Sequence, residues 1–148
     1  GERIIPGVQG QRVEAAFLGN VVGHVLLAWS NPDTRRIGYA VLNANMDLIP
    51  ESLNELDSPS KLDMDFPSVT RDQNENGIIT WGDTSDLYLY YALVDSFGEL
   101  LTPPMTFRSG GSPEYPRIKT SQAGEGNTTL STEYIYRRFM PYSMFKGR

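Results

Sequence analysis

The fold is decided by residues 66–107, which read FPSVT RDQNENG IITW GDTSD LYLYYALVD SFGE LLTPPMTF. Four runs in this stretch are rich in β-branched, aromatic and aliphatic residues, and they are separated by clusters of Gly, Asn, Asp and Ser. The runs cover residues 66–70, 78–81, 87–95 and 100–107. Pro103 and Pro104 suit an outer edge strand, where a missing backbone donor costs little. The pattern predicts a four-stranded antiparallel meander.

The same pattern occurs earlier in the chain. A shift of 52 residues places Trp29 on Trp81 and Phe17 on Val69, and it places Tyr39-Ala40 on Tyr91-Ala92. A fixed period near 50 residues with about four strands per unit is typical of the blades of a β-propeller. The sequence therefore predicts an all-β, propeller-like chain of four-stranded antiparallel meander repeats.

The repeat divides the chain into five segments. Residues 1–12 are expected to be the last strand of a preceding blade, because Ile4-Ile5-Pro6 resembles Leu48-Ile49-Pro50. We expect residues 13–56 to form a blade-like repeat, 57–65 a connection, 66–109 a second blade-like repeat and 110–148 a partial third one. Such a set is too small for a ring of four to eight blades. We therefore expect a partial ring, or a segment of a longer propeller, with a sandwich or open array of the same meanders as the alternative.

The strands of the individual units follow from the same runs. In the first unit we expect strands near residues 13–18, 21–29, 37–43 and 48–53. In the third unit Tyr115 to Ile118 matches the opening of the second, and residues 134–139 are a candidate third strand.

Composition limits the function. The chain of 148 residues is 39% hydrophobic, which is enough for one sizeable core. Its net charge is −5 and its basic residues are scattered, so a nucleic-acid partner is not expected. We expect no membrane span, because no run is long and apolar enough, and the first residues lack the charged, apolar and small-residue pattern expected of a leader. The absence of cysteine excludes disulfides and thiolate chemistry, and leaves the compartment open.

One loop has the alternating oxygen ligands of a calcium site. Asp72, Asn74 and Asn76 precede Gly77, and Ile78 offers its carbonyl group. The position that should supply a bidentate carboxylate is Gly82, with Asp83 one place late. Asp72, Asn74 and Asn76 are therefore the candidate metal ligands, for calcium, and the alternative is an ordinary Asx-rich hairpin turn.

The sequence does not predict an enzyme. His24 is the only histidine, and its apolar neighbours predict a packed or edge imidazole on a strand rather than a general base. Glycosidases need two carboxylates, and some acids fall near expected turns and strand ends. These are Asp83, Asp86, Asp95 and Glu99, with loop solubilisation as the alternative role. Aromatic residues that could line a carbohydrate groove, but are more often core, are Trp29, Trp81, Tyr88, Tyr90, Tyr134 and Tyr136.

The second unit resembles the blade repeat of large exported bacterial repeat proteins of the β-propeller type. In that class Tyr-Ala-Leu-x-Asp ends the third strand and a Gly-x-Leu turn leads to the fourth, and residues 91–100 follow this pattern. The first unit departs from it at Met46, which replaces the glycine. The resemblance implies secretion or surface display and a binding or scaffolding role, without a particular ligand.

These observations predict a non-catalytic structural or interaction module of an exported or cell-surface bacterial repeat protein. Its expected partners are copies of itself or neighbouring blades, since stacked repeats with open ends bind further repeats. The alternative is a carbohydrate-binding or glycosidase-type β-propeller with a glycan partner. No cofactor other than calcium is predicted.

Overall fold

Regular structure in the chain is almost entirely β-strand. The computed structural model describes residues 5–8, 10–57, 64–83, 88–108, 117–123 and 127–133. Within these ranges one 3-10 turn, η1 (Pro50–Ser52), is the single helical element, and every strand pairing is antiparallel. The prediction of an all-β chain with four-stranded antiparallel sheets is confirmed. A propeller, in which such sheets are arranged as blades around a central channel, stays a prediction.

The strands form three sheets in chain order. Sheet A contains β1 (Gln11–Phe17), β2 (Val25–Asn31), β3 (Arg36–Leu42) and β4 (Asn54–Glu55). Sheet B contains β5 (Met64–Arg71), β6 (Gly77–Asp83), β7 (Tyr88–Val94) and β8 (Met105–Arg108). Sheet C contains β9 (Arg117–Ala123) and β10 (Asn127–Glu133).

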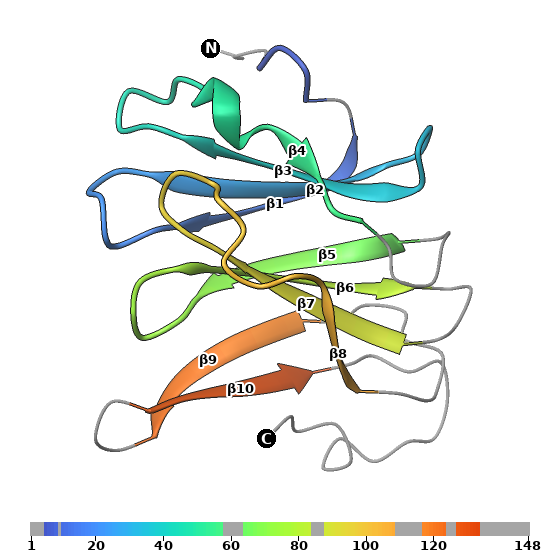
Figure 1. The fold of residues 1–148 in the computed structure, drawn as a ribbon, viewed down its shortest axis with the longest axis vertical. Helices are drawn as coiled ribbons and strands as arrows, with labels where there is room; N and C mark the ends of the chain where they lie inside the picture. Colours follow the sequence, from blue (N-terminus) through green and yellow to red (C-terminus); the bar gives the residue numbers. More distant parts are fainter. Residues whose placement is uncertain are drawn as a thin grey trace.

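The three sheets are stacked one on another (Figure 1). Sheet B lies between sheets A and C, and the first strands of the sheets are neighbours, with β1 against β5 and β5 against β9. Sheets A and B have the same linear strand order.

The second strands of sheets A and B, β2 and β6, are buried on both faces. β2 reads VLLAWSN and is buried from Val25 to Ser30, and β6 is buried along its whole length. Such continuous burial is expected of a strand that has a paired strand on each side and a packed layer above and below. β1, at the edge of sheet A, is exposed along almost its whole length.

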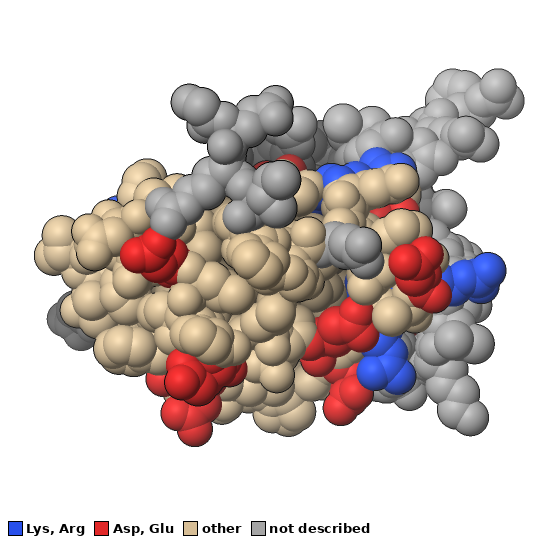
Figure 2. Space-filling model, turned by 90° about the horizontal axis from the view of Figure 1, so that it is seen from above, with Lys and Arg blue, Asp and Glu red and all other residues tan. Residues whose placement is uncertain are grey.

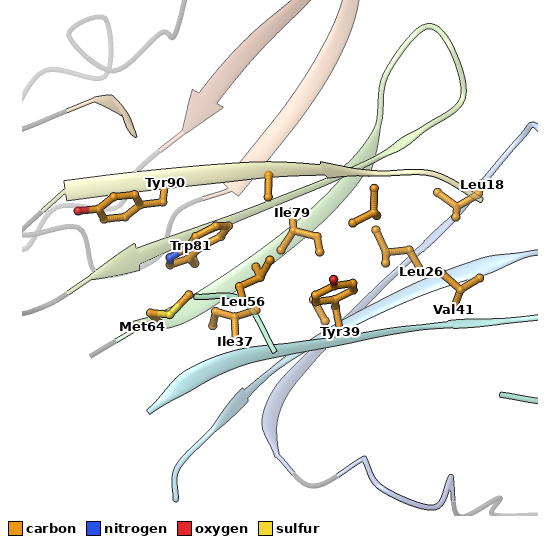
Figure 3. Close-up of a cluster of buried hydrophobic side chains, with 13 residues drawn as sticks. Leu18, Leu26, Ile37, Tyr39, Val41, Leu56, Met64, Ile79, Trp81 and Tyr90 are labelled. Atoms are coloured by element: carbon orange, nitrogen blue, oxygen red, sulfur yellow. The ribbon is translucent and has the colours of Figure 1, made fainter. Parts of the chain in front are cut away.

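A core of thirteen buried side chains joins sheets A and B (Figure 3). Sheet A contributes Leu26, Ala28 and Val41, and sheet B contributes Ile79 and Trp81, among others. Burying each large apolar side chain stabilises the fold by roughly 1.5–3 kcal/mol. This core is therefore the main attachment of one sheet to the other.

The opposite face of sheet A has a core of its own. Val25, Leu27, Trp29, Ala40 and Leu42 gather there, because alternate residues of a strand point to opposite faces. The N-terminal segment covers this face with Ile5 and Val8, and the segment after β3 adds Leu48 and Leu53. The ring of Trp29 lies where a Cβ on Gly38 would be, so only glycine fits that position of β3.

Trp29 and Trp81 hold the same place in their sheets. Trp29 is paired with Gly38 of β3, and Trp81 is paired with Tyr90 of β7. Trp81 packs in the core between sheets A and B, whereas Trp29 packs on the face of sheet A that points away from sheet B. The two sheets therefore pack through non-equivalent faces. Sheet B uses the face that contains its tryptophan, and sheet A uses the face that does not.

The turns after β3 and β7 are built alike. Asn43 Oδ1 accepts hydrogen bonds from the amides of Asn45 and Asp47, at 2.9 and 3.0 Å. Asp95 Oδ1 accepts them from the amides of Phe97 and Glu99, at 2.8 and 2.9 Å. These are Asx turns, in which a short polar side chain satisfies its own loop.

The outermost strands differ from the prediction. Leu48 and Leu100 form single bridges to Leu42 and Val94, and the strands β4 and β8 begin only after prolines. Strands over residues 48–53 and 100–107 were therefore predicted too early. Pro50 starts η1, and Pro103 and Pro104 precede β8 because proline has no amide hydrogen for strand pairing.

The first strands correspond by a shift of 54 residues rather than 52. Each has a register irregularity near its start, between Gln11 and Glu14 in β1 and between Asp65 and Ser68 in β5. The placement of Phe17 on Val69 was therefore wrong, because the β1–β2 loop (18–24) is longer than the β5–β6 loop (72–76).

The segment predicted to be a partial third repeat contains the antiparallel strand pair of sheet C. β9 begins at Arg117 and pairs with β10 along its whole length, from Arg117↔Glu133 to Ala123↔Asn127. The sequence did not predict β10. The candidate third strand at residues 134–139 lies outside the described residues.

Candidate functional site

A small cavity lies where sheets A and B end together. Its volume is about 130 Å³. Gln11 begins β1, Ser30 and Asn31 end β2, and Met64 and Asp65 begin β5, so antiparallel pairing brings these strand ends together. The full lining is Gln11, Ser30, Asn31, Pro32, Arg35, Met64 and Asp65.

Asp65 is the best-connected polar residue of the cavity. Its Oδ1 accepts hydrogen bonds from Ser30 Oγ at 2.5 Å and from the Phe66 amide at 2.7 Å. Arg12 Nε lies 3.3 Å from the same oxygen, and the Arg12 guanidinium group lies over the Phe66 ring at 4.5 Å. Hydrogen bonds to a carboxylate are stronger than neutral ones, so this oxygen is held firmly in place.

The backbone around the cavity is strained. Arg12, Arg35 and Phe66 have φ of 54°, 57° and 58°, in the left-handed region that side chains larger than glycine rarely adopt. Arg12 and Phe66 lie within the register irregularities of β1 and β5. Such bulges change the direction of nearby side chains and occur often beside binding sites.

The predicted calcium loop is an Asx-capped hairpin. Asp72 Oδ1 accepts a hydrogen bond from the Asn76 amide at 3.0 Å. Asn20, from the β1–β2 loop of sheet A, donates through Nδ2 to Asn74 O at 2.7 Å and to Asn76 Oδ1 at 3.3 Å. Asn76 Oδ1, one of the oxygens proposed as calcium ligands, thus also links sheet B to sheet A, and calcium binding by this loop stays a prediction.

His24 is a packed residue between the two sheets. It is 7% exposed, and its Nδ1 donates to the carbonyl oxygen of Ser96 at 2.7 Å. Its ring meets the edge of Phe97, with centroids 5.3 Å apart. His24 precedes β2 and Ser30 lies near the other end, roughly 20 Å along the strand. The structure therefore does not bring the histidine to Ser30 and Asp65.

Those aromatic and acidic candidates for a carbohydrate groove that lie within the described residues are not gathered at one surface. Trp81 is fully buried and stacks on Tyr90, with centroids 5.9 Å apart, whereas Trp29 is buried in the separate core of sheet A. Asp83 is also fully buried, and Asp95 is used by its turn. Tyr88 is partly exposed beside Tyr90, and Glu99 is exposed in the β7–β8 turn. Asp86, Tyr134 and Tyr136 lie outside the described residues.

The sequence did not indicate the cavity residues. Asp65 was placed in a connecting segment, and Gln11 and Arg12 in a strand of a preceding unit. Only the register of β1, β2 and β5 brings Gln11, Ser30 and Asp65 together, and no local motif marks that register.

Two further features bear on function. The part of the chain that the structure describes contains no group of three or more His, Asp or Glu side chains placed to hold a metal ion. In the same ranges no helix has the length and apolar character needed to cross a membrane. No protein-family model, curated protein or solved structure matches the chain.

Proposed function

We propose that the chain is a non-catalytic structural and interaction module whose four-stranded sheets stack as repeats. The observation that carries the proposal is the way sheets A and B meet. The face of sheet B that contains Trp81 packs on sheet A, and the equivalent face of sheet A contains Trp29 and points away. Stacking through unlike faces can continue beyond two sheets, as in repeat proteins and in head-to-tail oligomers.

The N-terminal segment supports this proposal. Ile5 and Val8 pack on the Trp29 face of sheet A, and Ile49 packs against the core that contains Trp81. The Val8 amide donates to Ile5 O at 3.2 Å, and the Ser52 amide donates to Ile49 O at 3.0 Å. Residues 5–8 thus resemble the segment that follows β3, as expected if they end a preceding unit.

The surface at this end of the stack favours contact with another protein layer. Seen from the sheet A side, the described surface is mostly uncharged, with acidic residues and a few basic ones towards its margins (Figure 2). Charged residues are depleted from the centres of protein interfaces. The partners that we propose are further blades of a longer array or other copies of the chain.

Export and cell-surface display form part of this proposal. They are supported by the resemblance of residues 66–107 to the repeats of exported bacterial proteins.

Uncovering the Trp29 face tests the stacking proposal. Removal of residues 1–9 exposes Val25, Leu27 and Trp29, and we expect the shortened chain to associate more strongly than the intact chain, because apolar surface drives association. Light scattering on a sizing column measures the mass of both. A shortened chain that is folded by circular dichroism and remains monomeric would contradict the proposal.

A milder variant provides the same test if the chain without residues 1–9 does not fold. Ile5→Ser combined with Val8→Ser weakens the cover without removing it, and should raise association in the same direction. Met46→Ser is the matched control, because Met46 is an exposed apolar residue that belongs to neither core cluster.

A further inference from the structure

The cavity between the ends of sheets A and B has charges of both signs at its lining. Asp65 supplies a negative charge to its lining and Arg35 a positive one, and Arg12 lies beside the Asp65 carboxylate. An anionic ligand would meet Asp65, and a cationic ligand would meet Arg35 and Arg12. The charges therefore favour a neutral ligand.

The hydrogen-bonding groups of the cavity differ in how much they are already used. Asn31 is occupied, since its Oδ1 accepts from the amides of Asp33 and Thr34 and its Nδ2 donates to Glu55 at 3.0 Å. Within the described residues, neither Asp65 Oδ2 nor the amide group of Gln11 has a hydrogen-bond partner. An acceptor and a mixed donor and acceptor are thus available to a ligand.

The remaining lining is apolar. Met64 is buried at 3% exposure and Pro32 is exposed, and both present hydrocarbon to the cavity beside its polar groups. A volume of about 130 Å³ is well below the range of pockets that enclose a drug-sized molecule. It suits one edge of a small ring.

We propose that this cavity binds the edge of a neutral sugar ring through two adjacent hydroxyl groups. One hydroxyl donates to Asp65 Oδ2, and the other bonds to the side-chain amide of Gln11. The C–H groups of the ring lie against Met64 and Pro32. The hydrogen bonds from Ser30 and Phe66 to Asp65 Oδ1, together with the ion pair to Arg12, fix the carboxylate before the ligand arrives, which lowers the entropic cost of binding.

Titration of the ¹⁵N-labelled chain with the methyl glycosides of glucose, galactose and mannose tests the proposal. We expect saturable amide shifts at Gln11, Ser30, Asn31 and Asp65 for at least one glycoside. Binding through a few hydrogen bonds corresponds to a dissociation constant on the order of millimolar. The fully O-methylated glycoside, which has no hydroxyl donors, should give no such shifts.

Two variants identify the side chains involved. Gln11→Ala should weaken binding about fivefold and Asp65→Asn about tenfold, because a hydrogen bond to a charged acceptor is the stronger one. Glu99→Gln, an exposed acid that does not line the cavity, should leave binding unchanged. The Gln11 side chain is exposed, and its amide group has no hydrogen-bond partner in the described residues. Gln11→Ala should therefore fold, and it keeps the test valid even if Asp65→Asn does not.

Three results would overturn the proposal. One is the absence of saturable shifts with every glycoside, which would leave the cavity as a hydrated notch. Another is glycoside binding that Gln11→Ala does not change. The third is tighter binding of N-acetylarginine methylamide than of any glycoside, which would make the site one for a cationic side chain.

Discussion

At the scale of single residues, Trp81 is the largest side chain that is fully buried in the described part of the chain. Trp81 is fully buried and stacks on Tyr90 in the core between the sheets. Its Nε1 has no hydrogen-bond partner in the described part of the chain. Trp81 therefore stabilises through its apolar area, offset in part by an unsatisfied donor.

Trp81→Ala should lower the free energy of unfolding by about 3–5 kcal/mol, because it leaves a large cavity between sheets A and B. Trp81→Phe is the matched control. It removes the unsatisfied donor and keeps a ring, so the expected loss is only about 1–2 kcal/mol. Urea unfolding followed by circular dichroism measures both. A loss below about 1 kcal/mol for Trp81→Ala would show that the sheets are not joined by this core.

Tyr39 gives the chain a sensitivity to alkaline pH. Tyr39 is 5% exposed, and its burial raises the pKa of the phenol above 10.0. Below pH 10 the phenol is neutral in both states, so it adds no pH dependence. Above that pH the unfolded chain releases the proton and the folded chain keeps it, so stability falls as pH rises.

Tyr39→Phe should remove part of this alkaline loss. The measurement is the urea midpoint at several pH values from about 9 to 11 for both chains. We expect the urea midpoints of the original chain and of Tyr39→Phe to differ by a constant amount below pH 10. Above pH 10 the midpoint of the original chain should fall more steeply, so that the two curves converge or cross. Parallel curves over the whole range would mean that Tyr39 is not kept neutral by the core.

At the scale of elements, the sequence predicted the strands whose composition decides their state. β2, β3, β6 and β7 are apolar runs between polar turns, and they lie close to their expected positions because a central strand must be buried on both faces. β4 consists of two polar residues, and β8 is a short strand that follows two prolines. Composition therefore does not indicate where either strand begins or ends. β10 reads NTTLSTE, with a single large apolar residue, and no pattern distinguishes it from a loop.

Site residues were harder to predict for a related reason. The Asx turns at Asn43, Asp72 and Asp95 use side chains within a few residues of their partners, so sequence alone can indicate them. The contact between Asp65 and Ser30 depends on the packing of two sheets and the register of two strands. Such long-range geometry has no local signal.

The turn after β3 contains a non-glycine residue in the left-handed backbone region. Met46 has φ of 65°, and Gly98, at the equivalent position of the turn after β7, has φ of 83°. A non-glycine residue in this region costs roughly 1–2 kcal/mol. Met46→Gly should therefore stabilise the chain by about 0.5–1 kcal/mol, after the greater flexibility of glycine in the unfolded chain is allowed for.

Gly98→Ala is the converse change. A Cβ at position 98 would lie 2.5 Å from Ser52 Cβ, so substitution should be destabilising by about 2 kcal/mol or more. Thermal unfolding of both variants gives the comparison. Opposite signs are expected, and a loss of stability in Met46→Gly would mean that the two turns are not equivalent.

At the scale of the whole molecule, the proposed interaction role depends on how the sheets stack. Sheets A and B share their strand order, their Asx turns and the place of a tryptophan, and they meet through unlike faces. A stack of this kind has no symmetry that closes it after two sheets. We therefore expect each copy to offer surface on which a further sheet can pack.

Sedimentation velocity of the 148-residue chain over about a hundredfold range of concentration tests this claim most directly. The account predicts species larger than the monomer whose share increases with concentration. A single folded species with the mass of one chain at every concentration would contradict it.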